Sequence, residues 1–240
     1  NVKKPPFDNV LVRRAANYAV DKEAIAKYVL FDTVEAAKSP LPPVLPVHNP
    51  DVNPYEYDPE KAKELLREAG YPDGFDCDLW TMESGTYRAV AEAVVEYLRQ
   101  VNIRARMITY DSAVYWEKFD EFLTPEGEEF PTKDGCYDVY IGGWTGGESP
   151  YSTLYPLFIG KSYHNSSFYD SPEVNDLLNS LKTMTDPADR DGIYRKLQEI
   201  IVDDAPWIFA YHGQITFGMR PRVQGFRVSP AEEFNMVGVR

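Results

Sequence analysis

Three pairs in this sequence place a capping residue directly before a proline and ahead of a helix-forming segment: Asp58-Pro59, Ser171-Pro172 and Asp186-Pro187. An Asp or Ser side chain in that position accepts a hydrogen bond from the first helical turn, where proline loses nothing by lacking an N–H. Each pair therefore predicts the start of a helix. The first helix is expected over 59–69, with Gly70 as its left-handed end. The third carries an apolar stripe at helical spacing: Ile193, Leu197, Ile200 and Ile201.

Two more helices follow from apolar residues that recur every three or four positions. One covers 9–20 and restarts at Asp21 to cover 22–30, and the other covers 86–101. On the helix predicted over 86–101, one face carries Tyr87, Val90, Val94, Leu98 and Val101. Segments rich in β-branched and aromatic residues lie between the helices and predict strands at 76–81, 103–110, 137–142, 208–211 and 215–219. This alternation predicts an α/β fold.

Two stretches are predicted to be loops. Residues 39–54 contain six prolines, too many missing donors for a helix or a sheet ladder, so an extended connection laid over the surface is expected. Residues 124–135 are acidic and rich in turn formers, which indicates an inserted surface loop. A short helix is expected after Asp111, carrying Tyr115 and Trp116.

Composition narrows the class of protein. The 240 residues are 43% hydrophobic and 26% charged, which is typical of a globular protein with a sizeable core. The 38 Asp and Glu residues outnumber 25 Lys and Arg, and the net charge of -13 disfavours nucleic acid and anionic membrane surfaces as partners. No apolar run approaches the ~20 residues that a membrane-spanning helix needs. The first residues lack a signal core, so either a targeting segment is missing or the chain starts inside a longer one.

A glycine-rich loop with a tryptophan follows the strand-like segment near residue 140. The run from Asp138 to Tyr151 includes Gly142-Gly143-Trp144-Thr145-Gly146-Gly147 and lacks the endings of phosphate-binding and dinucleotide-binding loops. Aromatic residues gather just after it, including Tyr151, Tyr155, Phe158 and Tyr163. Rings with hydroxyl groups suit sugars and peptide side chains alike, although a tight turn followed by core aromatics is the alternative. Trp144, which has a glycine on one side, fits a ligand contact best.

Catalytic and metal-binding patterns are not found. His48, His164 and His212 are scattered, and none belongs to a His-Glu-x-x-His motif or accompanies a Gly-x-Ser-x-Gly elbow. Two cysteines and three histidines give no pair at zinc-ligand spacing. We therefore expect no enzyme activity, no metal and no cofactor. Cys77 and Cys136 allow either two free buried thiols, the preferred interpretation, or one disulfide.

Four segments together resemble one family. The opening segment from Asn1 to Ile25 contains Pro5-Pro6-Phe7-Asp8 and Asn17-Tyr18-Ala19-Val20-Asp21. It is similar to a signature of the family 5 solute-binding proteins, the dipeptide, oligopeptide and nickel receptors of ABC importers. The segments 57–75, 144–146 and 203–208 resemble the same family in the same order.

This resemblance implies a fold and a domain organisation. Family members are about twice as long, with two lobes around a cleft, and the matching motifs belong to their C-terminal half. The implied fold is a periplasmic-binding-protein-like lobe of class II type, a mixed sheet flanked by helices. Residues 1–210 are expected to form the C-terminal ligand-binding lobe. Residues 211–240 are expected to hold the return strand and tail toward a missing N-terminal lobe.

The resemblance also implies a function outside the cytoplasm. The chain is expected to capture an oligopeptide or an oligosaccharide by closure of the two lobes and, as a monomer, to deliver it to a membrane permease. Peptide-binding relatives carry an Asp three residues after the loop tryptophan, and here that position is Gly147. The two ligand classes therefore stay level. A sensor module of a regulator and a carbohydrate-active hydrolase are the alternative functions.

Contacts to the ligand are predicted by position in the motif. Trp144 is expected to stack on the ligand, and the residues that follow it to form hydrogen bonds or flank it. The full set of candidates is Trp144, Thr145, Gly146, Gly147, Glu148, Tyr151, Tyr115 and Ser84. Tyr115 and Ser84, together with Trp116 beside Tyr115, are the weaker candidates, since packing or helix capping is the favoured explanation for each.

Overall fold

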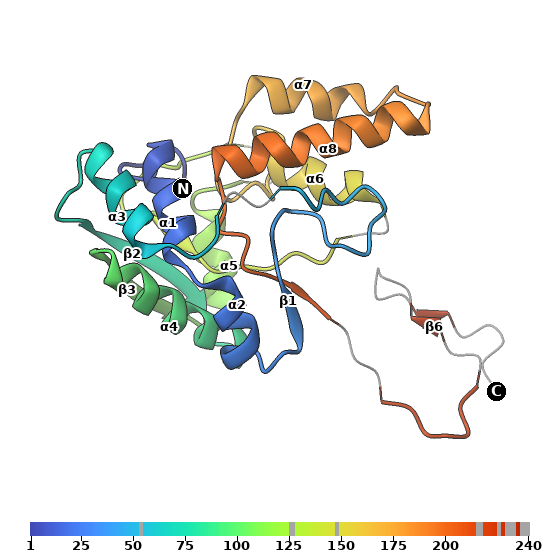
Figure 1. Ribbon diagram of the computed structural model, residues 1–240, viewed down its shortest axis with the longest axis horizontal. Helices are drawn as coiled ribbons and strands as arrows, with labels where there is room; N and C mark the ends of the chain where they lie inside the picture. Colours follow the sequence, from blue (N-terminus) through green and yellow to red (C-terminus); the bar gives the residue numbers. More distant parts are fainter. Residues whose placement is uncertain are drawn as a thin grey trace.

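The computed structural model confirms an α/β architecture (Figure 1). It describes residues 1–52, 55–124, 128–146, 149–214, 218–224, 227–228 and 234–235. The central element is a parallel three-stranded sheet in the order β3-β2-β4, formed by β2 (Phe75–Met82), β3 (Ile103–Tyr110) and β4 (Val139–Tyr140). Parallel neighbours need a crossover, and α4 (Gly85–Gln100) supplies the one between β2 and β3.

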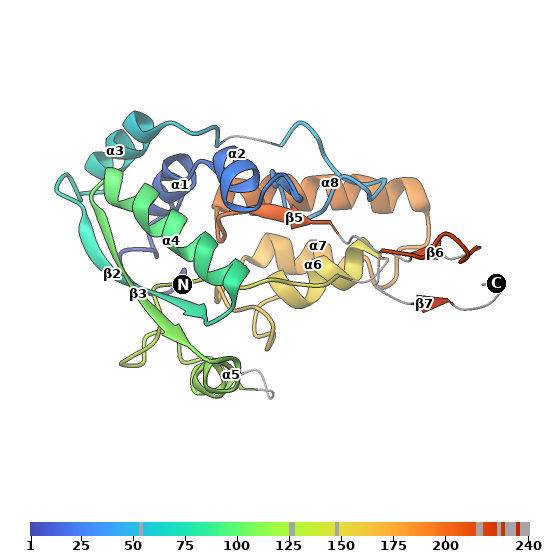
Figure 2. The same cartoon turned by 90° about the horizontal axis from the view of Figure 1, so that it is seen from below.

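Helices cover both faces of this sheet. α4, α1 (Val10–Ala19) and α3 (Pro59–Glu68) lie on one side and α5 (Ser112–Asp120) on the other (Figure 2). Side chains of β2 alternate accordingly: Phe75, Cys77 and Leu79 enter a core with α1, α3 and α4, which we call the first core. Trp80 faces the opposite way, into an aromatic cluster built with α5. That cluster contains Trp80, Tyr115, Phe119, Phe122, Tyr137 and Phe168.

A second core lies under a group of three helices. α6 (Pro150–Phe158), α7 (Pro172–Ser180) and α8 (Pro187–Asp204) stand together beside the sheet domain (Figure 1). The apolar residues that they contribute to the second core include Leu154, Phe158, Val174, Leu178, Leu197 and Ile201. In the predicted stripe of α8, Leu197 and Ile201 are fully buried, whereas Ile193 and Ile200 are partly buried against the same core.

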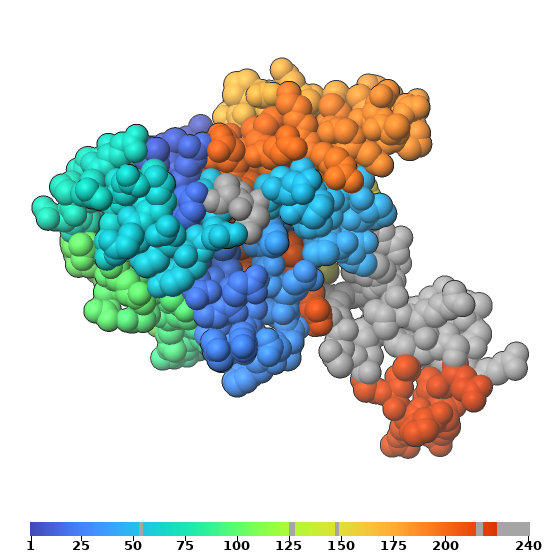
Figure 3. Space-filling model, in the orientation of Figure 1, coloured from blue at the N-terminus to red at the C-terminus, as the bar shows by residue number. Residues whose placement is uncertain are grey.

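The proline-rich segment differs from the prediction. Leu41, Val47 and Val52 are buried in the second core, so this segment is a packed wall and not a surface connection. Figure 3 shows the segment, in light blue, lying against α8, in orange. Its backbone groups find partners on the side chain of Gln198. Oε1 of Gln198 accepts from the backbone N–H of Asn49 at 3.0 Å, and its Nε2 donates to the carbonyl of Val47 at 2.8 Å.

The helix starts agree with the capping signals. Asp58, Ser171 and Asp186 each accept a hydrogen bond from the first turn of α3, α7 and α8. Gly70 follows α3 with a φ of +91°, as its predicted role requires. The helix predicted over 22–30 is split into α2 (Lys22–Ala24) and a π-helical turn, η1 (Ile25–Val29).

Strand limits were the weaker part of the prediction. The segment 137–142 contributes only Val139–Tyr140 to the ladder, and the strand predicted at 208–211 lies instead at β5 (Tyr211–Gly213). β5 pairs antiparallel with β1 (Val34–Ala36), which was not predicted. Of the strand predicted at 215–219, residues 215–217 lie outside the described part of the chain. Farther along, β6 (Arg227–Val228) and β7 (Phe234–Asn235) pair with each other.

Both cysteines are free and buried, so the free-thiol interpretation is confirmed. Burial raises the pKa of the Cys136 thiol to about 11 and that of Cys77 to about 12. Neither sulfur therefore ionises near neutral pH. Over the described ranges, no helix combines the length and the apolar character needed to cross a bilayer.

Candidate binding pocket

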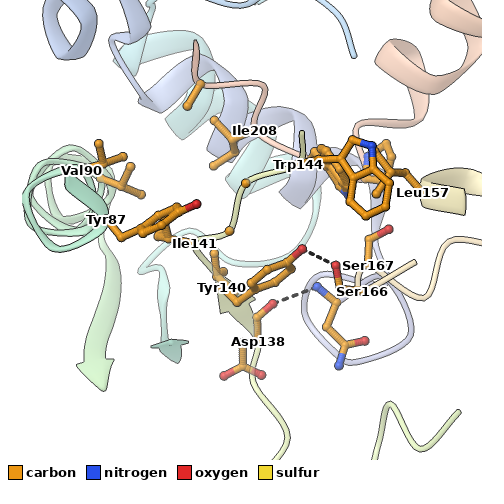
Figure 4. Close-up of a pocket in the computed structure, with 18 of the residues that line it drawn as sticks. Tyr87, Val90, Asp138, Tyr140, Ile141, Trp144, Leu157, Ser166, Ser167 and Ile208 are labelled. Carbon is orange, nitrogen blue, oxygen red and sulfur yellow. Dashed lines mark hydrogen bonds between the residues drawn. The ribbon is translucent and has the colours of Figure 1, made fainter. Parts of the chain in front are cut away.

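A cavity of about 240 Å³ opens at the carboxyl ends of β2 and β4, where the parallel sheet meets the second core. We call it the strand-end pocket. Ligands of open α/β sheets commonly bind beyond the carboxyl ends of the strands. Figure 4 shows side chains from α4, β4 and its following loop, and the segment after α8 converging on this space. The residues labelled there are Tyr87, Val90, Asp138, Tyr140, Ile141, Trp144, Leu157, Ser166, Ser167 and Ile208.

One wall consists of α4, α5 and the glycine loop. Tyr87 and Val90 project from α4, and Trp116 projects from α5 with 48% of its surface exposed. Trp144 from the loop is 39% exposed, and its ring centroid lies 4.9 Å from that of His164. Two partly exposed tryptophans on one pocket leave ring surface available to a bound molecule.

The glycines of the loop permit close approach to neighbouring rings. A Cβ at Gly143 would lie 2.6 Å from the hydroxyl oxygen of Tyr87, and one at Gly142 would lie 2.4 Å from a ring carbon of Tyr140. Real Cβ atoms do not come this close to other heavy atoms. The pair of glycines therefore allows the loop to touch α4 on one side and the aromatic cluster on the other.

The floor is made of α1 and the segment after α8. The guanidinium of Arg13 donates to the carbonyl of Asp204 through Nε at 3.0 Å and Nη2 at 2.8 Å. Its Nη1 donates to the carbonyls of Phe7 and Asp8 at 2.9 and 3.0 Å. Burial lowers the pKa of Arg13, and the nearby Asp204 opposes this shift. Arg13 therefore ties the first core to the end of α8.

Asn17 reinforces the same junction. Its Nδ2 donates to the carbonyl of Trp207 at 3.1 Å and to that of Arg13, also at 3.1 Å. The side chain is buried, and among the described residues its Oδ1 has no hydrogen-bond partner. Both Asn17 and Trp207 line the pocket, so the geometry of its floor depends on the junction between α1 and α8.

The third side is fixed by β4. The carboxylate of Asp138 forms an ion pair with Nζ of Lys4 at 2.8 Å and accepts a hydrogen bond from the N–H of Asp78 at 2.7 Å. Its carbonyl accepts from the backbone nitrogen of Asn1 at 2.9 Å. The hydroxyl of Tyr140 is hydrogen-bonded to that of Ser166. Figure 4 draws this contact and the one between Asp138 and Asn1 as dashed lines. Burial raises the pKa of Tyr140, so its hydroxyl stays neutral.

The structure places the predicted contact residues in different environments. Trp144 lines the pocket with an exposed ring, and Tyr115 lines it as a buried residue whose hydroxyl donates to the carbonyl of Ile141 at 3.4 Å. Thr145, Gly146, Tyr151 and Ser84 lie outside its lining. Gly146 faces Thr153, and Tyr151 stacks on Tyr155 with ring centroids 5.0 Å apart. Gly147 and Glu148 lie outside the described residues.

Several lining residues escaped the sequence analysis. Tyr87 was predicted on one helix face with Val90 and Val94, and that spacing indicates a core position as readily as a pocket wall. Asn17 was noted only within the opening family signature, and its place in the pocket was not predicted because it depends on Trp207, which lies 190 positions away. Within the described ranges, no group of three or more His, Cys, Asp or Glu side chains is arranged to hold a metal.

Comparisons with known proteins identify the family. Residues 1–165 match the family described as bacterial extracellular solute-binding proteins, family 5 Middle. Heme-binding protein A of Haemophilus influenzae is 35% identical over 238 residues, which cover 96% of this chain and 41% of that protein. The dipeptide-binding protein of Escherichia coli is 32% identical, with 96% of this chain and 42% of that protein covered. This chain thus spans less than half the length of these relatives.

Solved structures agree with this assignment. DppA of Helicobacter pylori, solved with the peptide STSA, has a TM-score of 0.77 and 30% identity, over 89% of this chain and 40% of that one. A dipeptide-binding protein of Pseudoalteromonas, solved with Met-Leu, has a TM-score of 0.82 and 28% identity, over 100% of this chain and 46% of that one. These structures show the same fold as part of a longer protein. The chain therefore belongs to family 5 of the bacterial extracellular solute-binding proteins.

Proposed function

We propose that this chain is part of the substrate-binding component of an ABC importer, which captures a peptide outside the cytoplasm and delivers it to a membrane permease. The observation that carries the proposal is the strand-end pocket, where aromatic side chains and loop backbone groups surround a cavity at the carboxyl ends of parallel strands. The peptide-binding relatives and the peptide-bound neighbours support it. The mechanism needs binding and release only, with no enzymatic step.

The domain organisation that we propose follows the predicted boundaries. Residues 1–210 form one ligand-binding lobe, and residues 211–240 begin the return toward a second, N-terminal lobe. The peptide is enclosed when the two lobes close, and the protein acts as a monomer. This chain matches only 41% to 42% of the length of two curated relatives, which supports the existence of such a partner lobe.

An oligosaccharide is the second candidate ligand. The exposed ring of Trp144 favours it, because a flat aromatic surface stacks on a sugar ring as well as on a peptide side chain. Hydrogen-bond donors of the loop backbone suit neutral hydroxyl groups. Both candidate ligands would therefore use the same surface, and they are distinguished by which of them stabilises the protein against unfolding.

A thermal-shift screen of the protein at its natural length tests both candidates. Di- to hexapeptides are compared with cello-, xylo- and manno-oligosaccharides. A ligand at 100 times its dissociation constant stabilises by about 2.7 kcal/mol, which raises the melting temperature by several degrees. We expect peptides to give this shift and Trp144→Ala to reduce it. A shift with sugars alone selects the second candidate, and no shift with either class contradicts the proposal.

Gly143→Ala is expected to weaken binding while leaving stability nearly unchanged. The new Cβ would meet the hydroxyl of Tyr87 at 2.6 Å, so the ring must turn and the pocket wall changes shape. We expect peptide affinity to fall about tenfold and the free energy of unfolding to change by less than about 1 kcal/mol. Gly192→Ala is the matched control, since its Cβ would meet nothing within 4 Å. Equal affinities of the two variants would show that Tyr87 does not shape the site.

A further inference from the structure

The charged residues that line the strand-end pocket are already paired within the protein. All four hydrogen bonds of the Arg13 guanidinium go to backbone carbonyls, at 2.8 to 3.0 Å. The carboxylate of Asp138 is occupied by Lys4 on one oxygen and by the N–H of Asp78 on the other. A ligand group that carries a charge would therefore lose water without gaining a partner from Arg13 or Asp138.

The part of the binding site that this chain encloses is small. Its volume of about 240 Å³ lies below the range of about 300–1,000 Å³ that is typical of pockets for drug-sized ligands. One large side chain fills such a space, while the rest of the ligand stays outside it. The pocket is thus a subsite for a single group.

The surface offered to that group is aromatic. Trp116 and Trp144 line the pocket with 48% and 39% of their surfaces exposed, and they come from α5 and from the loop after β4. Tyr87 adds a third ring from α4. Aromatic pairs prefer offset or edge-to-face contacts, which rings arriving from separate elements provide. An aliphatic side chain gains burial here but not these ring contacts.

We infer that the strand-end pocket selects peptides by taking up one uncharged aromatic side chain. This inference rests on the proposed peptide-binding function and adds a preference to it. A Lys or Arg side chain is also attracted to ring faces, but among the described lining residues its charge finds no available carboxylate, because Asp138 is paired with Lys4. The imidazole of His164, tilted at 59° to the ring of Trp144, extends the same aromatic surface.

A guest series of tripeptides tests this preference. One residue X is placed at each position of a tri-alanine host in turn, with X as Phe, Trp, Leu, Lys or Glu, and affinities are measured by calorimetry on the protein at its natural length. At one position we expect Phe and Trp guests to bind at least about tenfold more tightly than Lys and Glu guests. Leu is expected to lie between these two groups.

Variants locate the effect in the pocket. Trp116→Ala is expected to remove most of the advantage of the aromatic guests, and Trp116→Phe to restore much of it. Phe31→Ala is the matched control, since Phe31 is an aromatic residue with 82% exposure that lies outside the lining. It should leave the guest series unchanged.

The outcomes separate this inference from the proposed function. If all guest tripeptides bind with equal affinity, the aromatic preference is overturned and peptide binding stays in place. A series in which the Lys guest binds most tightly also overturns it, because the site would then recognise a cation. If no tripeptide binds and no di- to hexapeptide shifts the melting temperature, peptide capture fails and the aromatic preference fails with it.

Discussion

Arg13→Ala is expected to lower the free energy of unfolding by about 3 kcal/mol, because a charged donor shared by three backbone carbonyls disappears. Two of its four bonds hold the carbonyl of Asp204 at the end of α8, where helical carbonyls have no partner within the helix. Denaturation by urea, followed by circular dichroism, measures the loss. Arg13→Lys should recover little of it, since an ammonium cannot reproduce the fork of a guanidinium.

Arg14→Ala is the matched control for this prediction. Arg14 is the next residue on α1 and donates to the carbonyl of Asp203 at 2.9 Å, and it also pairs with the exposed carboxylate of Asp203 at 2.8 Å. Exposed ion pairs contribute about 1 kcal/mol or less. If both variants lose the same stability, the Arg13 guanidinium does not stabilise the junction between α1 and the end of α8.

Gln198→Leu is expected to cost a similar amount, about 3 kcal/mol, although it introduces an apolar residue of comparable size. The Gln198 amide is fully buried, and it binds the N–H of Asn49, the carbonyl of Val47 and the hydroxyl of Ser39. Leucine leaves these buried groups without partners, and each unpaired group costs about 1–3 kcal/mol, with partial relaxation. Denaturation midpoints give the total.

Hydrogen exchange shows where the loss in Gln198→Leu arises. The amide of Asn49 should exchange much faster in the variant, because its acceptor is gone. Glu199→Ala is the neighbouring control: its carboxylate accepts from the side chain of Asn49 at 3.1 Å on the exposed side of α8, and its loss should cost less than about 1 kcal/mol. Unchanged protection at Asn49 in Gln198→Leu would contradict this account.

Local signals predicted the helices well. The starts of α3, α7 and α8 were found because a cap and a proline act within four residues of each other, without help from the rest of the chain. Strand limits were predicted less well, because a strand ends where its backbone stops pairing with the neighbouring strand, and that neighbour lies elsewhere in the sequence. Only Val139–Tyr140 of the six predicted residues pair with β2.

The proline-rich segment shows what local signals miss. Its prolines correctly excluded a helix and a ladder, but its burial depends on Gln198, which lies 159 positions from Ser39. In the pocket, Trp144 was identified from the glycine-rich loop in which it lies, whereas Tyr87 shares the spacing of core residues on α4. When one helix face is core at one end and pocket wall at the other, the spacing of its residues does not show which positions belong to the core and which to the pocket.

The two sides of the strand-end pocket differ in how freely they can change during evolution. Arg13 and Asn17 on the floor also join α1 to the end of α8, so a substitution there alters ligand contacts and folding together. Trp116 and Trp144 on the wall are partly exposed. Divergence in ligand preference among close homologues is therefore expected to concentrate on α5 and the glycine loop, while the floor stays constant.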